Sequence, residues 1–254
     1  MSPRFPQELF DYIIDYAQDD EETLKIYSVV CKSWSIRSQT HLFERQQFCT
    51  LRDLEQWCEN IPPTKDGPSK YVKYIHLQTG FPPLVPEPPS SLSLVHFSAL
   101  TRVDYLFLFG HRGKLNFDLF AQCCSGFKYS LLLLELSCNS FDFEEIARMV
   151  EFFPKLELLV VWGPSSERSG HTGPYQPPRQ ISFPHLKGLN FDLQGPTPEL
   201  DNHILSGFAK ASMNLVDISF VGTAIDLALA QELLNSSAHS LISLEVSPLG
   251  KPCS

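Results

Sequence analysis

The chain has 254 residues, with 43% hydrophobic and 19% charged side chains, a composition that fits a globular protein with a sizeable core and argues against general disorder. Its net charge of −9 and its lack of any Lys/Arg run argue against nucleic acid as a partner, because phosphate binding needs clustered basic side chains. The N-terminus lacks a signal-peptide layout and no apolar run could span a bilayer, so we expect no membrane contact and a cytoplasmic or nuclear location.

Three short helical patterns fill the first forty or so residues of the chain. Pro6 suits the first position of a helix, because its φ is fixed and its missing N–H is not needed there. Leu9 and Ile13 then continue an apolar face at i, i+4 spacing, and the acidic stretch 19–22 separates this helix from the next. A third segment carries Trp34. Three helices of this length bury a small core and expose apolar side chains, which indicates a partner.

The chain divides into three parts by pattern. Thr50 and Asp53 form a capping-box variant at the start of a further helix, which ends before Pro62-Pro63. This segment bridges the helical patterns and the repetitive region behind them. The predicted division is a helical module at 1–46, a bridging helix with a Pro-rich linker at 47–70, and a repeat region at 71–254.

A short pattern, apolar-x-x-apolar-x-apolar, recurs seven times in the repeat region. The spacings between successive units are 28, 31, 25, 30, 29 and 26 residues, and such fixed-period similarity is typical of repeat architectures. Helix-like segments at 117–127, 143–153, 199–211 and 227–237 lie between the units. The seven units begin at Val72, Leu100, Leu131, Leu156, Leu186, Leu215 and Leu241.

Alternating strands and helices predict parallel strands joined by right-handed crossovers. The expected fold class is α + α/β: a three-helix module followed by an α/β solenoid with a curved, parallel sheet of about seven strands. The sheet would form the inner face and the helices the outer face. The alternative is an ordinary doubly wound α/β domain, which would need longer apolar strands and a Gly-rich turn.

No catalytic motif accompanies this fold. The sequence contains no GxSxG, Walker loop, GxGxxG or HExxH, and its eight histidines are scattered. Glu144 and Glu145 suit the first turn of a helix rather than an acid–base pair. We therefore expect no enzymatic activity, no cofactor and no metal. A nucleotide- or substrate-binding α/β enzyme with cryptic residues remains an alternative.

The outward side of the predicted strands offers a binding surface, because side chains alternate between the two faces. Its two rows contain four acidic residues and no Lys or Arg. We expect this face to recognise a protein segment of basic or mixed apolar–basic character, with Trp162 as an anchor, although a merely solvated face remains an alternative. The predicted substrate-binding residues are His76, Asp104, Glu135, Trp162, Asp192 and Glu245.

The N-terminal pattern resembles an F-box. The residues that carry the resemblance are Phe5-Pro6-x-Glu8-Leu9, Ile13-Ile14, Val29-Val30-Cys31-Lys32-x-Trp34 and Leu42-Phe43. Family members often open with Leu-Pro, where this chain has Phe5-Pro6. Residues 131–139, LLLLELSCN, are similar to a leucine-rich repeat, whereas the other units lack its Asn.

The resemblance implies a non-catalytic substrate receptor of an SCF-type cullin–RING ubiquitin ligase. The F-box would dock to a Skp-type adaptor and, through it, to a cullin, while the repeat region presents a protein substrate and raises its local concentration near the ligase. The alternative is a stand-alone leucine-rich-repeat scaffold whose N-terminal helices cap the solenoid. By family pattern the adaptor contact carries over to Pro6, Leu9, Ile13, Ile14, Val30 and Leu42.

Overall fold

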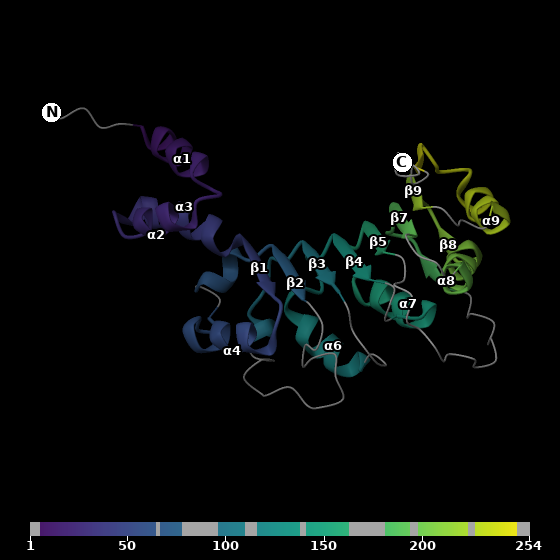
Figure 1. Ribbon diagram of the computed structural model, residues 1–254, viewed down its shortest axis with the longest axis horizontal. Helices are drawn as coiled ribbons and strands as arrows, with labels where there is room; N and C mark the ends of the chain where they lie inside the picture. The colour runs from purple at the N-terminus through teal and green to yellow at the C-terminus, as the bar shows by residue number, and fades with distance from the viewer. Residues whose placement is uncertain are drawn as a thin grey trace, which may run out of the picture.

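The structure of the protein is a computed structural model. It shows a row of parallel strands with helices along one side and three helices at one end (Figure 1). This mixture of helix and parallel sheet confirms the coarse fold prediction. The residues described are 6–64, 67–77, 96–109, 116–137, 141–162, 181–193, 198–222 and 227–247.

The main sheet has eight strands, one more than predicted, and its strand order follows the chain without any reversal. Every pairing in it is parallel. Parallel neighbours in chain order mean that each connection advances the chain by one strand in the same direction. The strands are β1 (Arg45–Phe48), β2 (Tyr74–Leu77), β3 (Tyr105–Leu108), β4 (Leu133–Ser137), β5 (Leu158–Trp162), β7 (Gly188–Leu193), β9 (Asp217–Gly222) and β10 (Ser243–Ser247).

The helices that follow the strands match the predicted segments within a few residues. Two of them begin with a capping box, in which the N-cap side chain and the N3 side chain each accept a bond from the other's backbone N–H: Thr50 with Asp53 in α4, and Asp142 with Glu145 in α7. The short strands β6 (Ser182–Phe183) and β8 (Ser212–Met213) pair with each other in a separate two-stranded sheet. They belong to the segments that lead into the next two strands of the main sheet, β7 and β9. The helices are α4 (Leu51–Asn60), η1 (Pro68–Tyr71), α6 (Phe117–Cys124), η3 (Ser125–Phe127), α7 (Phe143–Phe152), α8 (Pro198–Lys210) and α9 (Leu227–Ser237).

One face of the sheet packs against these helices and forms the core. In β4, for example, Leu134 and Leu136 are fully buried, whereas the alternating residues Leu133 and Glu135 are half-buried. Buried aromatic rings such as Phe208 of α8 fill the space between helices and strands. The opposite side of the sheet, called the open face below, carries the alternate side chains of each strand.

The register of β3 corrects one predicted repeat unit. Ile75 of β2 pairs with Leu106, and His76 pairs with Phe107. Asp104 precedes the strand, so the prediction that it belongs to the outward row beside His76 and Glu135 was wrong, and Phe107 occupies that place. The unit begins at Val103 rather than Leu100. Both choices give spacings of 28 and 31 residues to the neighbouring units, only in the opposite order, so the period does not distinguish them.

The eighth strand, β1, was not predicted. It pairs with β2, with Gln46 opposite Ile75. Gln46 is polar, whereas the equivalent residue of each later strand up to β9 is apolar and buried. The apolar-x-x-apolar-x-apolar pattern therefore does not extend to β1. The predicted boundary at residue 46 falls inside β1, and α4 follows this strand as later helices follow theirs.

The N-terminal helices α1 (Gln7–Tyr16), α2 (Glu21–Tyr27) and α3 (Lys32–Glu44) form a small module, called the helical module below. Ile14 and Leu24 are its fully buried apolar side chains, and the half-buried Trp34 ring joins the three helices, with its centroid 5.5 Å from that of Phe10 and 4.9 Å from that of Tyr27. The last helix of the module runs directly into β1, so module and sheet share one continuous backbone connection.

Candidate functional site

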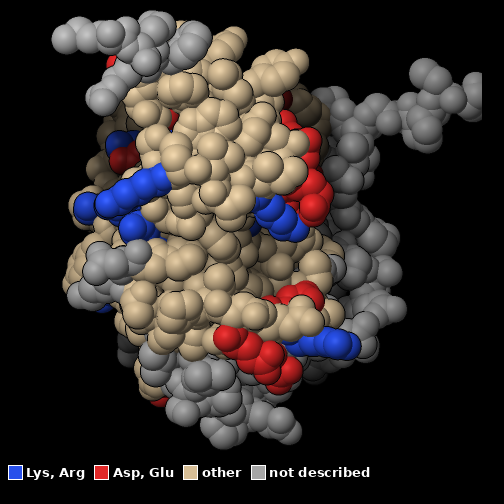
Figure 2. Space-filling model, turned by 90° about the vertical axis from the view of Figure 1, so that its left-hand side faces the viewer, with Lys and Arg blue, Asp and Glu red and all other residues tan. Residues whose placement is uncertain are grey.

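The helical module exposes many apolar side chains. Leu9 is 50% exposed, Ile13 44% and Val30 56%. Figure 2 shows the end of the molecule formed by this module, with a broad area free of charged side chains and charges at its borders. Several large apolar side chains exposed on one small module mark a candidate interaction site. The large apolar residues exposed on the module are called the apolar set below: Leu9, Tyr12, Ile13, Tyr16, Ile26, Val29, Val30 and Ile36.

The predicted adaptor-binding residues divide between surface and core. Pro6, like the three residues above, is exposed, and Leu42 is half-buried. Ile14 is fully buried and belongs to the core of the module, so it cannot contact a partner directly. Leu9 and Ile13 form one i, i+4 stripe of α1, and Phe10 and Ile14 form another; the structure turns the second stripe inwards. Phe5 and Asn139, which belong to the two resemblances, lie outside the described residues.

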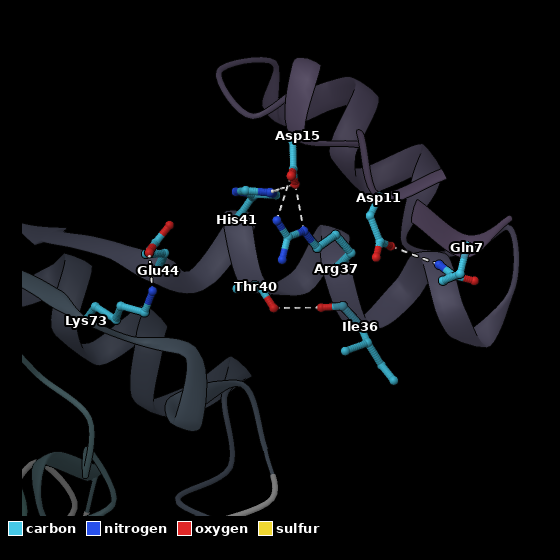
Figure 3. A network of polar contacts seen from close by, with 9 residues as sticks. All are labelled: Gln7, Asp11, Asp15, Ile36, Arg37, Thr40, His41, Glu44 and Lys73. Carbon is cyan, nitrogen blue, oxygen red and sulfur yellow. Dashed lines mark hydrogen bonds and ion pairs between the residues drawn. The ribbon is translucent and has the colours of Figure 1, made fainter. Parts of the chain in front are cut away.

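A polar network holds α1 on α3 (Figure 3). Both oxygens of Asp15 accept from the Arg37 guanidinium, at 2.6 Å from Nε and 2.6 Å from Nη2, and His41 Nε2 lies 2.7 Å from Asp15 Oδ1. The Arg37 hydrogen bonds lower the pKa of Asp15 to about 2. A second pair, Lys73 Nζ to Glu44 Oε1 at 2.8 Å, joins the end of α3 to the start of β2. The Asp15 contacts fix α1, with the members of the apolar set that it carries, on α3.

We expect the Asp15 network to give the protein a pH-dependent stability. Because the folded pKa is depressed, the stabilisation is present above the unfolded pKa of about 4 and is lost as the pH falls towards 2. Asp15 is 37% exposed, so after solvent screening the contribution is about 1 kcal/mol. Urea unfolding of wild type and Asp15→Asn should differ at pH 7 and converge between about pH 4 and 2. Asp19→Asn, an exposed carboxyl in the following turn, is the control; a gap that stays constant with pH would contradict this assignment.

The open face carries a second surface, whose rows are defined by the strand pairing. Three rows of side chains run across the strands. The first row starts at Arg45, Tyr74 and Tyr105, and the third row includes Trp162 and Asp192. The middle row crosses all eight strands, through Gln47, His76, Phe107, Glu135, Val160, Asn190, Ser219 and Glu245.

Aromatic rings dominate this face between β1 and β5. The centroids of His76 and Phe107 are 4.4 Å apart, and those of Tyr74 and Tyr105 are 5.8 Å apart. The Arg45 guanidinium carbon lies 5.3 Å from the Tyr74 centroid, within the range of a cation–π contact. Trp162 is 40% exposed. This part of the open face is therefore aromatic and partly exposed, and aromatic residues and Arg are enriched in protein-binding surfaces.

A single carboxylate lies among these rings. Tyr105 Oη donates a short hydrogen bond to Glu135 Oε2, and Trp162 Nε1 donates a short one to Glu135 Oε1. Burial and the bond to Glu135 together raise the pKa of Tyr105, so its hydroxyl stays a donor. Glu135 thereby fixes the side chains of the strands on both sides of it.

A shallow hollow of about 330 Å³ adjoins this region on the β1 side. Burial lowers the pKa of His76, against the opposing charge of Glu135, so the imidazole is biased towards its neutral form. Its Nε2 atom is buried without a hydrogen-bond partner. The hollow is lined by Arg45, Gln46, Gln47, Tyr74, Ile75, His76 and Tyr105.

The structure brings together three of the six predicted substrate-binding residues. His76, Glu135 and Trp162 share the aromatic part of the open face, whereas Asp192 is only 9% exposed and Glu245 is exposed on the last described strand. The sequence prediction missed Arg45, Tyr74, Tyr105 and Phe107. Reading the second unit from Val103 would have placed Tyr105 and Phe107 on the outward side, and alternation from His76 would have placed Tyr74 there. Only Arg45 needed the pairing of β1 with β2.

Within the described ranges, no group of three or more His, Cys, Asp or Glu side chains is placed to hold a metal ion. Among the helices in the same part of the chain, none has both the length and the apolar character needed to cross a membrane. No protein-family model, curated protein or solved structure matches this chain.

Proposed function

We propose that the protein is a non-catalytic substrate receptor of an SCF-type ubiquitin ligase, with the helical module binding a Skp-type adaptor and the sheet binding the protein substrate. The observation that carries the proposal is the apolar set, which a three-helix module displays at one end of a repetitive sheet. The F-box resemblance, which includes Leu9, Ile13, Val29 and Val30 of this set, supplies the kind of partner.

The placement of the helices favours this proposal over a scaffold whose N-terminal helices merely cap the sheet. A cap would bury its apolar side chains against the first strand. Here α1 and α2 pack mainly on α3, and α3 in turn contacts β1 and η1 (Figure 1). The first two helices thus stand away from the sheet, and their exposed apolar side chains remain available to a separate protein.

The sheet supports the second half of the proposal. Its strand order follows the chain, and its units recur at similar spacing, which is how a leucine-rich-repeat-like solenoid would be built. In the described part of the chain the helices lie along one face of the sheet, which leaves the open face for a protein-sized contact (Figure 1). A receptor with these two surfaces needs no chemistry of its own, because it acts by holding substrate near the ligase.

Binding to a purified Skp-type adaptor tests the proposal. The double variant Leu9→Asp/Ile13→Asp places two charges in the apolar set, and we expect affinity at least tenfold weaker, about 1.4 kcal/mol or more. The matched control is Tyr129→Asp/Leu132→Asp, which alters two exposed apolar residues (65% and 42%) beside the sheet. Circular dichroism should show both variants folded.

Three outcomes would overturn the proposal: wild type that does not bind adaptor, a Leu9/Ile13 variant that binds as wild type does, or equal losses in both double variants. Absence of binding by wild type would favour the stand-alone scaffold.

A further inference from the structure

The environment of Glu135 is unusual for a carboxylate on a protein surface. Its cross-strand neighbours are Phe107 and Val160, and Tyr105 and Trp162 lie diagonally on the same two strands. Among the described residues, its hydrogen bonds come only from the phenol and the indole, both neutral donors. A carboxylate accepts about four hydrogen bonds, so acceptor capacity remains. The group is held in place without being neutralised.

No cation of the described residues neutralises Glu135. Lys73 and Lys187 are paired with the carboxylates of Glu44 and Glu157. Arg45, on the same face, belongs to β1, three strands away from β4, a separation of about 14 Å at the usual strand spacing. A half-buried charge among apolar rings costs free energy unless it is paired, so a cation from outside would find both a charge and a desolvated position.

We propose that Glu135, with the rings of Tyr105, Phe107 and Trp162, forms a binding site for a basic side chain of the substrate protein, arginine in preference to lysine. The inference rests on the proposed function in taking the open face as the substrate surface, and it adds the chemical feature that a substrate presents there.

The preference for arginine follows from the rings. A guanidinium is planar, delocalised and weakly hydrated, so it stacks on aromatic faces and loses little hydration on entering an apolar surface. A lysine ammonium is compact and strongly hydrated, so it gains less from the same rings. Trp162, 40% exposed and oriented by its bond to Glu135, offers a ring beside the carboxylate.

A titration followed by nuclear magnetic resonance tests the site directly. The indole N–H signal of Trp162 is assigned by its absence in Trp162→Phe, and the probes are acetyl-Leu-X-Leu-amide tripeptides, with X as arginine, lysine or citrulline. Citrulline has the shape of arginine without its charge. We expect the arginine probe to shift the signal with a dissociation constant in the ~1 mM range, the lysine probe to bind severalfold more weakly, and citrulline at least about tenfold more weakly.

Two variants complete the test. Glu135→Gln keeps the side-chain shape and one acceptor, and it should weaken the arginine probe at least about tenfold. Glu151→Gln removes an exposed carboxylate from α7, on the helix-covered side of the sheet, and should leave binding unchanged. Amide spectra report whether each variant is folded, and the citrulline comparison in wild type needs no variant at all.

Equal binding of citrulline and arginine, unchanged binding by Glu135→Gln, or no shift of the Trp162 signal up to about 20 mM probe would overturn the proposal. Lysine binding as tight as arginine binding would overturn the arginine preference. Adaptor binding reads only the helical module, so a failed titration with adaptor binding intact rejects this site alone. A successful titration without adaptor binding rejects the ligase proposal and leaves a cation site on a scaffold.

Discussion

Replacing Phe208 by alanine is expected to lower the free energy of unfolding by about 3–5 kcal/mol. The Phe208 side chain is fully buried in α8. Its ring centroid lies 5.1 Å from that of Phe143 in α7, 5.9 Å from Phe183 in β6 and 5.8 Å from Phe191 in β7. Truncation removes apolar burial and leaves a cavity where four elements meet.

The neighbours of Phe208 have little room to collapse into that cavity. Gly207 already brings α8 so close to α7 that an added Cβ would lie 2.3 Å from the Phe143 ring. Urea unfolding followed by circular dichroism measures the loss, and Phe109→Ala is the matched control, because this ring is 41% exposed. The control should cost less than about 1 kcal/mol. Equal losses would mean that Phe208 does not occupy the centre of the core.

Leu106→Ala is expected to destabilise the protein by about 2–5 kcal/mol, because this side chain is fully buried and pairs in register with Ile75 and Leu134. Phe107→Ala should cost about 1 kcal/mol, since that ring is half-buried on the open face. The two positions are adjacent in sequence and differ only in the face they occupy. The comparison therefore tests the register of β3 with nearly the same local backbone.

The denaturant midpoints of the two variants, measured at one pH, show which of the two side chains is buried. If Phe107→Ala lowered the free energy of unfolding more than Leu106→Ala does, Phe107 would be the buried residue. The unit would then begin at Leu100, and Asp104 would belong to the outward row. The same pair bears on the proposed cation site: Phe107→Ala should weaken the arginine probe while the fold remains stable.

The sequence by itself determined the alternation of strands and helices. Six of the seven predicted units lie on strands in the predicted frame, and the helix at 227–237 was predicted to the residue. These predictions succeeded because the signals are local: apolar spacing, capping pairs such as Asp142 with Glu145, and prolines before strands. The outward places of His76, Glu135 and Trp162 followed from the alternation of side chains along each strand.

Only the tertiary structure decided which of two equally apolar stripes is buried. Residues 105–109 read YLFLF, in which every side chain is apolar or aromatic, so alternation alone cannot assign a face and cross-strand pairing does so. Helix α1 poses the same problem: Leu9 with Ile13 and Phe10 with Ile14 share one spacing, and packing on α3 buries the second pair's Ile14. The bonds from Tyr105 and Trp162 to Glu135 join strands about thirty residues apart, a contact that no local pattern records.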